Sequence, residues 1–312
     1  MVLFGLLLLP ILLLLLLLYF IVRPRPINIP IKNRHLAIAK QAASEGARIS
    51  LLARSVDQLQ KAKESICQAY EVEVSIFSAD VRDYDAVERA IKEAGPIDVL
   101  VVNHGVYYVE EFETQGLDVM KTMIDVNLMG SFNVIKAALP LMKDKKDKGP
   151  ASIALMSSMA GQAGIYGFAA YSATKFGLRG LAEALQQELL VNNIHLSTIC
   201  LEFISVLTFQ AREKMPEITK IILESSPGMK AEEVGKITIQ GIKSGSFSIP
   251  CRLDGQAVAI ATAGLSPQTS FLMASIEVVF AGLFRFLALL LQWRGYEIIE
   301  KYNYSHKKQQ VE

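Results

Sequence analysis

The amino-acid sequence predicts an α/β domain in which helices cover both faces of a doubly wound parallel sheet. Short apolar strands alternate with helices of ten or more residues over positions 36–200, which is typical of a parallel sheet. Polar residues follow several of these strands, at the edge where such sheets bind ligands. The chain of 312 residues is long enough for one such domain together with further apolar segments.

The individual elements follow from apolar spacing and from end signals. Strands are expected where apolar residues run together or alternate, over 47–53, 72–79, 98–102, 151–156 and 195–201. Helices are expected where apolar residues recur at helical spacing, over 36–45, 56–69, 84–94, 117–142 and 169–191. Gly46 and Gly95 supply C-terminal stops for two of these helices.

Both ends of the chain carry apolar segments. Residues 1–22 contain no charged side chain, and a helix of that length spans a bilayer core of about 30 Å. A basic Arg-Pro-Arg-Pro segment follows without a small-residue cleavage site, which predicts an uncleaved anchor and a main domain facing the cytosol. Residues 271–293 are also apolar but include Glu277 and Arg285. They are expected to span or lie on the membrane, or else to pack on the domain.

Composition excludes several other classes of protein. The formal net charge of +1 gives no indication of nucleic acid as a partner. The three cysteines are widely spaced and match neither a metal site nor a disulfide framework, so we expect reduced thiols and no bound metal. The expected parts of the chain are a transmembrane anchor (1–22), a linker (23–35), the α/β domain (36–265), a C-terminal apolar helix (266–300) and a polar tail (301–312).

The strongest functional signal lies between Ser157 and Leu178. Tyr171 and Lys175 stand at i and i+4 of one predicted helix, so their side chains share a face. A cation beside a phenol lowers its pKa, which makes Tyr171 a candidate general acid or base. Ser158 ends an apolar strand and is a candidate for holding a substrate oxygen. The alternative interpretation is a buried helix with a satisfied tyrosine and a lysine that reaches the surface.

Polar residues follow four of the predicted strands. They are Arg54, Asp80, Asn103 and Ser158. Because the carboxyl ends of parallel strands meet at one edge of a sheet, we expect these side chains to face the same cleft.

Together these motifs resemble the short-chain dehydrogenase/reductase family. The resemblance is carried by ASEGARISLLARS, FSADVRDYDAVERAI, GPIDVLVVNHG, DVNLMGSFNVIKAALP, the serine–tyrosine–lysine stretch and GLAEALQQEL. With the N-terminal anchor and its RPRPINIP flank, the chain is similar to the 3-dehydrosphinganine reductases of the endoplasmic reticulum membrane. The resemblance implies a Rossmann-like fold and the reduction of a long-chain lipid ketone by a nicotinamide cofactor.

The resemblance also implies roles for individual residues. Tyr171 would protonate the nascent alkoxide, and Ser158, with Ser157 the lesser candidate, would orient the carbonyl. Lys175 would lower the pKa of Tyr171 and hold the nicotinamide ribose. Asn127 would hold a water linked to Lys175, or tie its helix to a strand. The implied cofactor contacts are Asp80, Val81, Asn103, Gly105, Tyr171 and Lys175; His104, between two of them, is expected to be structural.

Arg54 indicates which nicotinamide cofactor is used. It follows the second strand of the family pattern, where folds selective for NAD carry an acidic residue and an arginine accommodates a 2′-phosphate. We therefore expect NADPH. The alternative is an exposed arginine at a strand end.

The chain departs from the family pattern in two places. The family begins with a strand and a glycine-rich turn, whereas here Gly46 is the first glycine after the membrane anchor. The backbone that would approach the cofactor's pyrophosphate is therefore missing, and we predict that the first strand is absent. Residues 27–31 could replace it, but Pro30 is a poor central-strand residue. Residues 201–208 also lack the family's Pro-Gly segment.

Three functions remain open at this point. The first is a membrane-anchored reductase of 3-dehydrosphinganine. The second is a non-catalytic membrane-anchored paralogue or splice product that pairs with an intact reductase through helices 117–142 and 169–191, the helices through which a homodimer would also form. The third is a reductase of another lipid ketone, such as a steroid or a retinoid.

Overall fold

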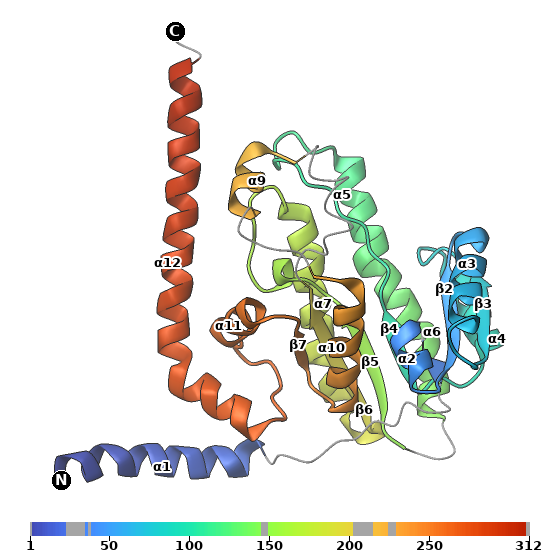
Figure 1. Ribbon diagram of the computed structural model, residues 1–312, viewed down its shortest axis with the longest axis horizontal. Coiled ribbons are helices and arrows are strands. Elements are labelled where there is room, and N and C mark those ends of the chain that lie inside the picture. Colours follow the sequence, from blue (N-terminus) through green and yellow to red (C-terminus); the bar gives the residue numbers. More distant parts are fainter. Residues whose placement is uncertain are drawn as a thin grey trace.

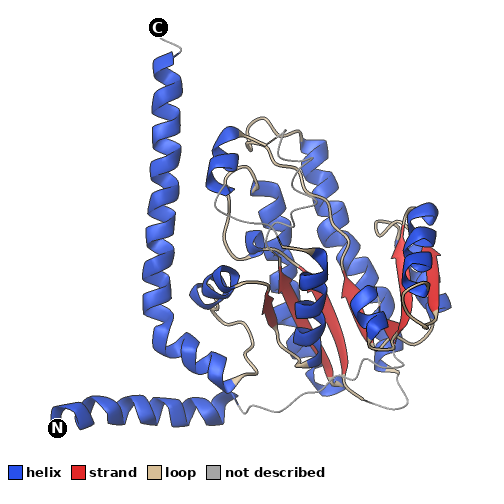
Figure 2. Cartoon of the chain, viewed as in Figure 1, coloured by secondary structure: helices blue, strands red, loops and turns tan. Residues whose placement is uncertain are grey.

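The structure is a computed structural model, and it places a parallel sheet between two layers of helices (Figures 1 and 2). It describes residues 2–22, 35–36, 39–144, 149–201, 215–223 and 229–309. Within these ranges, seven strands form one sheet in the order β3-β2-β1-β4-β5-β6-β7, and all neighbours pair in parallel. The prediction of a doubly wound parallel sheet is confirmed.

The strands are short. They are β1 (His35–Leu36), β2 (Arg48–Ala53), β3 (Val74–Ser78), β4 (Val99–Val102), β5 (Ala151–Met156), β6 (Ile194–Cys200) and β7 (Ser248–Pro250).

The helices between them include one π-helical and two 3₁₀ segments, labelled η. They are α1 (Val2–Val22), α2 (Lys40–Ser44), α3 (Val56–Cys67), α4 (Tyr84–Ala94), α5 (Leu117–Met123), η1 (Ile124–Met129), α6 (Gly130–Lys143), η2 (Met159–Gly161), α7 (Ala169–Leu189), η3 (Leu190–Asn192), α9 (Glu217–Leu223), α10 (Ala231–Lys243), α11 (Leu253–Ala261) and α12 (Phe271–Gln309).

The central strand corrects one prediction. His35–Leu36 forms a two-residue strand between β2 and β4, pairing with Arg48, Ile49 and Val99. The first strand is therefore shortened rather than absent, because the facing edges of β2 and β4 need a hydrogen-bonding neighbour. In consequence the helix expected over 36–45 is shorter in the structure, where α2 covers only Lys40–Ser44. The alternative replacement, residues 27–31, lies outside the described residues, as do residues 202–208.

Alternate residues of the strands pack on opposite faces of the sheet. Leu100 and Val102 of β4 contact the cluster formed with α4, α6 and α7. Val99 and Val101 belong to the cluster that includes residues of α2, α3 and α10. This period of two in the buried side chains places helices on both faces of the sheet.

The predicted elements agree with the structure except at specific points. The helix over 84–94 is confirmed in full, with Asp83 accepting a hydrogen bond from Ala86 N at its start and Gly95 at φ 81° at its end. The helix over 117–142 is divided by η1, where the backbone becomes π-helical. The elements α9, α10, β7 and α11 were not predicted.

The C-terminal helix α12 runs alongside the domain, where it contacts α11 and α9, and its end extends beyond the domain (Figure 1). By length and composition, Phe271–Ser305 can cross a membrane, and little of it is buried. Because the helix also contacts α11 and α9 of the domain, both interpretations of this segment, membrane-associated or packed on the domain, stay predictions. The helix also continues to Gln309, through most of the tail expected to be separate. At its start, Phe271 meets Tyr19 of α1 edge-on, with ring centroids 5.4 Å apart.

Candidate functional site

The carboxyl end of β5 and the first turns of α7 bring the serine, tyrosine and lysine together. Ser157 and Ser158 directly follow β5, and α7 carries Tyr171 and Lys175 one turn apart. Lys175 Nζ lies 5.4 Å from the centroid of the Tyr171 ring. The side chains of Ser158 and Tyr171 are hydrogen-bonded to each other. The structure thus brings together three of the four residues predicted as catalytic, and Asn127 adjoins them.

Tyr171 is enclosed by aromatic neighbours. The rings of Phe168 and Tyr107 lie 5.9 Å and 6.1 Å from it, centroid to centroid. Burial raises the pKa of Tyr171 to about 12, although the hydrogen bond from Ser158 opposes that shift. Burial is the largest cause of this shift, and the prediction that Lys175 lowers the pKa of Tyr171 stays a prediction.

Lys175 is a buried cation, with 3% of its surface exposed. Its Nζ donates a hydrogen bond to the main-chain oxygen of Met156 at 2.7 Å. Burial lowers the pKa of Lys175 to about 8. The alternative of a lysine that reaches the surface is therefore excluded, and the ammonium remains inside the site at neutral pH.

The two serines have different surroundings. Ser158 Oγ accepts a hydrogen bond from Ala160 N at 3.1 Å, which caps η2, and its side chain also reaches Tyr171. Ser157 Oγ instead donates to the main-chain oxygen of Lys175 at 3.4 Å. A side chain at Gly161 would meet Ser157 Oγ at 2.6 Å, so that glycine permits the close approach of η2 to α7. Ser158 is therefore the serine that faces the phenol.

Asn127 lies fully buried in the π-helical segment η1. Its Oδ1 accepts from Val106 N at 2.7 Å, and its Nδ2 donates to Val106 O at 2.8 Å and to Thr174 Oγ1 at 3.2 Å. The amide therefore ties η1 to the segment after β4 and to α7, which is the structural role foreseen for it. π-Helical turns are often found at functional sites.

The segment after β4 approaches both Asn127 and Lys175. A Cβ placed on Gly105 would meet Asn127 Oδ1 at 3.4 Å and Lys175 Nζ at 3.7 Å, so Gly105 leaves space directly above them. Asn103 is exposed at the end of β4. His104 lies 3.4 Å from Ser131 Oγ, and burial lowers its pKa to about 4, which keeps the imidazole neutral.

The ends of β2 and β3 supply a second group of polar residues. Arg82 donates to both carboxylate oxygens of Asp80, the shortest contact being 2.6 Å, and this pairing lowers the pKa of Asp80 to about 2, with a smaller contribution from Arg54. Val81 is buried, and its oxygen accepts a hydrogen bond from Asn133 at 2.9 Å. Arg54 is exposed, with its guanidinium free of any described ion pair.

A cavity of about 600 Å³ joins these strand ends. Arg54, Asp80, Val81, Asn103 and Gly105 all line it. Every cofactor contact predicted outside the catalytic group therefore faces one space, at the carboxyl edge of β2, β3 and β4. The cavity continues inward past apolar side chains of the sheet, including Leu100 and Val102.

These residues fit a dinucleotide only in part. The space above Gly105 beside Lys175 suits a ribose, and the Asp80 and Arg54 end suits an adenosine and its 2′-phosphate. No glycine occurs between Gly5 and Gly46 in the sequence. The helix after β1, α2, has five residues and no side-chain cap. The chain thus lacks the glycine-rich turn that usually brings backbone N–H groups to a pyrophosphate.

Sequence reasoning did not identify several groups around Tyr171. Tyr107 reaches the tyrosine ring from the segment after β4, and no spacing in the sequence marks it. Thr174 accepts from Asn127 and donates to Tyr171 O at 2.7 Å. Its place between Tyr171 and Lys175 on the same helix was the one available signal. The Met156 carbonyl that holds Lys175 is a backbone group, which a sequence pattern does not show.

A parallel Rossmann-like sheet with a serine, a tyrosine and a lysine at its carboxyl edge defines a class of nicotinamide-dependent oxidoreductases. The family model described as short chain dehydrogenase matches residues 36–217. The chain belongs to the short-chain dehydrogenase/reductase family, whose members use NAD(H) or NADP(H).

Curated relatives cover nearly the whole chain. The chain is 53% identical over 302 residues to 3-dehydrosphinganine reductase TSC10B of Arabidopsis thaliana, with 93% of this chain and 91% of the relative aligned. It is likewise 53% identical to TSC10A of the same plant, with 92% of each chain aligned. A 3-dehydrosphinganine reductase of Danio rerio is 36% identical over 81% of this chain and 78% of its own length.

Solved structures support the fold. A short-chain dehydrogenase/reductase from Burkholderia phymatum in complex with NAD aligns with a TM-score of 0.64 at 19% identity, covering 74% of this chain and 94% of that chain. L-Sorbose reductase from Gluconobacter frateurii, complexed with NADPH and L-sorbose, aligns with a TM-score of 0.63 at 19% identity, covering 72% and 96%.

Proposed function

We propose that this protein reduces 3-dehydrosphinganine to sphinganine with NADPH, at the endoplasmic reticulum membrane with its α/β domain facing the cytosol. The observation that carries the proposal is the 53% identity over 93% of the chain to plant reductases of that substrate. The grouping of Ser158, Tyr171 and Lys175 at the sheet edge supports it, because a ketone reductase needs a carbonyl-binding hydroxyl and a proton donor there.

The side chains divide the reaction between them. NADPH supplies the hydride when it is bound. Ser158 donates a hydrogen bond to the substrate carbonyl oxygen, and Tyr171 gives its proton to that oxygen as negative charge develops. Lys175 supports the charge on the phenolate that results, and Asn127 holds the segment of Gly105 against the same space.

The preference for NADPH rests on Arg54. It lines the cavity near Asp80, where a 2′-phosphate would extend from the adenosine. A planar guanidinium binds phosphate oxygens in pairs, and no acidic residue directly follows β2 to hold a ribose 2′-hydroxyl instead. Arg54→Ala should weaken NADPH binding by about tenfold and leave NADH binding unchanged.

The identity of the substrate is inferred from the curated relatives and not from the shape of the cavity. A steroid or retinoid ketone would also suit a membrane-anchored reductase. The near full-length identity to 3-dehydrosphinganine reductases from a plant, with a fish relative at lower identity, favours the long-chain 2-amino ketone.

A second candidate function is supported by the missing glycines. Without a glycine-rich turn, NADPH affinity could be too low for turnover, and the chain would then act by pairing with an intact copy. Exposed apolar side chains on neighbouring helices, such as Met129, Phe132 and Phe176, offer a surface for such pairing or for a homodimer.

One set of assays separates these functions. The detergent-solubilised chain should bind NADPH, seen as enhanced nicotinamide fluorescence, and should form sphinganine. Tyr171→Phe should lower kcat by about a thousandfold, whereas Tyr84→Phe, which removes a half-buried hydroxyl that hydrogen-bonds Glu88 on α4, should leave kcat unchanged. Absence of NADPH binding at millimolar concentration would contradict the reductase and leave the pairing function.

A further inference from the structure

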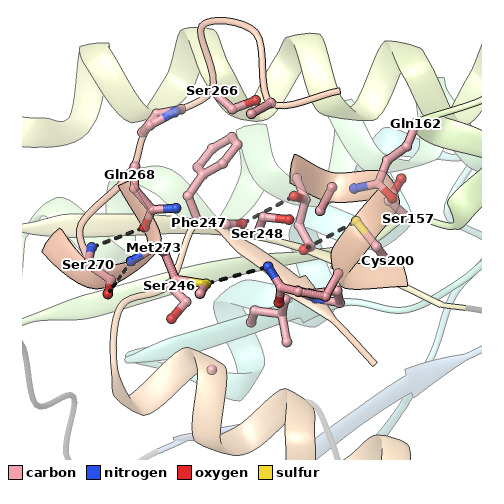
Figure 3. Close-up of a pocket in the computed structure, with 18 of the residues that line it drawn as sticks. Ser157, Gln162, Cys200, Ser246, Phe247, Ser248, Ser266, Gln268, Ser270 and Met273 are labelled. Atoms are coloured by element: carbon pink, nitrogen blue, oxygen red, sulfur yellow. Dashed lines mark hydrogen bonds between the residues drawn. The ribbon is translucent and has the colours of Figure 1, made fainter. Parts of the chain in front are cut away.

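A second cavity adjoins the candidate active site but takes no part in the roles proposed above (Figure 3). It has a volume of about 500 Å³ and is lined by residues of α7, β6, α10, β7, α11 and the first turns of α12. Ser157 lines it, and the next residue, Ser158, faces Tyr171. The two spaces therefore share a wall.

The walls of this cavity are rich in hydroxyl and amide groups. Figure 3 shows Gln162 and Ser157 on one side of it, and Gln268, Ser270 and Met273 on the other. Such a lining favours a ligand with several hydrogen-bonding groups over a purely apolar one.

The side-chain oxygen of Gln162 is a hydrogen-bond acceptor that is buried in the wall of this cavity. Only 8% of the surface of Gln162 is exposed, and its Oε1 has no hydrogen-bond partner among the residues that the structure describes. Buried polar atoms are nearly always paired. This oxygen therefore marks a position where a ligand would present an N–H or O–H group.

The charges around the cavity do not balance. Arg179 donates to Glu183 at 3.0 Å and to the main-chain oxygens of Thr262 and Ala263 at 2.6 Å and 2.8 Å, so its charge is already matched. Glu277 accepts a hydrogen bond from Gln268 at 2.7 Å and forms no ion pair among the described residues. One carboxylate is left over, which suits a ligand with a single positive charge.

The cavity lies where α12 leaves the domain. Ala274 in its second turn is buried, whereas Val278, Val279 and Phe280 are about half exposed, and apolar side chains remain exposed for much of the helix beyond them. A ligand with its polar end in the cavity could therefore extend an alkyl chain along α12, in the part of the helix suited to a bilayer.

We propose that this cavity binds the headgroup of a long-chain amino alcohol, with its ammonium on Glu277, its hydroxyl groups on the polar lining that includes Gln162, and its alkyl chain along α12 from Val278 onward. The site would hold substrate or product at the membrane surface, next to the reducing site. The identification of the amphiphile as a sphingoid base rests on the proposed function.

Photolabelling tests the proposal on the full chain in phosphatidylcholine nanodiscs, without cofactor. The probe is sphinganine with a diazirine near its headgroup. Labels are expected on α11 and the first turns of α12. Glu277→Gln should weaken sphinganine binding by about tenfold, whereas Glu297→Gln, a matched change at a half-buried position paired with Lys301 on the same helix, should not. N-acetylsphinganine, which lacks the charge, should bind wild type and Glu277→Gln equally.

Two outcomes would overturn the site: labels confined to peptides containing Tyr107 and Tyr171, or unchanged affinity in Glu277→Gln. If Glu277→Gln fails to fold, Gln162→Met supplies the second test, with an expected loss of several-fold in affinity. Reductase assays report separately on the proposed function. A chain labelled at α12 but unable to reduce 3-dehydrosphinganine would keep the site and refute the function.

Discussion

At the scale of single residues, burial shifts the pKa values of the two titratable groups of the site in opposite directions. It raises the pKa of Tyr171 to about 12 and lowers that of Lys175 to about 8. The phenol is therefore protonated throughout the physiological range. Because an alkoxide is a far stronger base than a phenolate, a protonated Tyr171 is prepared to act as an acid, which is the direction that ketone reduction requires.

The two adjacent serines should differ sharply when each is changed to alanine. The Ser158 side chain hydrogen-bonds with Tyr171, whereas the hydrogen bond given for the Ser157 hydroxyl within the described residues goes to a main-chain oxygen of α7 at the long distance of 3.4 Å. Ser158→Ala should lower kcat/KM for 3-dehydrosphinganine by about a hundredfold, and Ser157→Ala by less than about threefold. Steady-state kinetics of both variants measures this. A larger loss in Ser157→Ala would reverse the assignment.

Lys175 should make the folded state more stable as the pH rises above 8. Its pKa is about 8 in the folded chain against 10.5 for the unperturbed side chain. Between these values the unfolded state binds more protons, so the free energy of unfolding increases with pH, by about 2–3 kcal/mol up to pH 10. Urea denaturation followed by far-UV circular dichroism measures this.

Matched variants isolate the Lys175 contribution. Lys175→Met should abolish the rise in stability between pH 8 and pH 10, because no buried ammonium remains to titrate. Lys121→Met, which removes a largely exposed lysine paired with Asp125, should preserve it. A rise that persists in Lys175→Met would have to come from other groups and would refute this account.

At the scale of elements, the two-residue strand β1 is the weakest connection in the sheet. Within the described residues it joins β2 to β4 through three residue pairs. The cavity of about 600 Å³ lies along the same junction, with Leu51 and Leu52 on one side and Val101 and Val102 on the other. Figure 1 shows β2, β3, α3 and α4 grouped on one side of the molecule. Few buried contacts therefore hold β2 and β3 to the remaining strands.

Hydrogen exchange should reveal this junction as a boundary between units of different stability. We expect amides in β2 and β3 to exchange about a hundredfold faster than those in β5 and β6, because the smaller unit can open without disrupting the larger one. Exchange followed by mass spectrometry of peptides from the four strands provides the measurement. Equal protection in all four strands would mean that the sheet unfolds as one cooperative unit, and it would contradict the prediction.

The same elements show what a sequence pattern can specify. The strands that are buried on both faces were predicted from their continuous apolar residues. The helix α4 was predicted from its apolar spacing and from Gly95 at its end, and Asp83 caps its start. The π-helical turn at Asn127 was not predicted, because it occupies a short part of a long apolar helical stretch and has no residue signal of its own. β1 could not be recognised because its pairing depends on the edges of β2 and β4. Tyr171 and Lys175 were found by their spacing, but their pKa values depend on burial that spacing does not show.

At the scale of the whole molecule, the ends of the chain determine where the site lies. α12 contains 39 residues and is about 58 Å long, well beyond the bilayer core of about 30 Å. Its first turns pack on the domain, and most of its apolar side chains between Val278 and Trp293 are exposed. α1 has 21 residues, long enough to cross the same core. A domain held at the membrane in this way would take up a lipid substrate directly from the bilayer, so the lipid would not have to pass through water.

Crossing of the membrane by α12 should place the end of the chain on the lumenal face, opposite the domain. Asn303-Tyr304-Ser305 is an acceptor sequence for N-glycosylation, and these side chains are exposed. Expression in microsomes should therefore give a glycosidase-sensitive increase in mass that Asn303→Gln abolishes, while Asn193→Gln, outside any acceptor sequence, retains it. The basic residues of the tail favour the cytosolic face and oppose this arrangement, so the test discriminates. An unmodified Asn303 whose tail is cleaved by protease added outside intact microsomes would mean that α12 lies along the cytosolic surface instead.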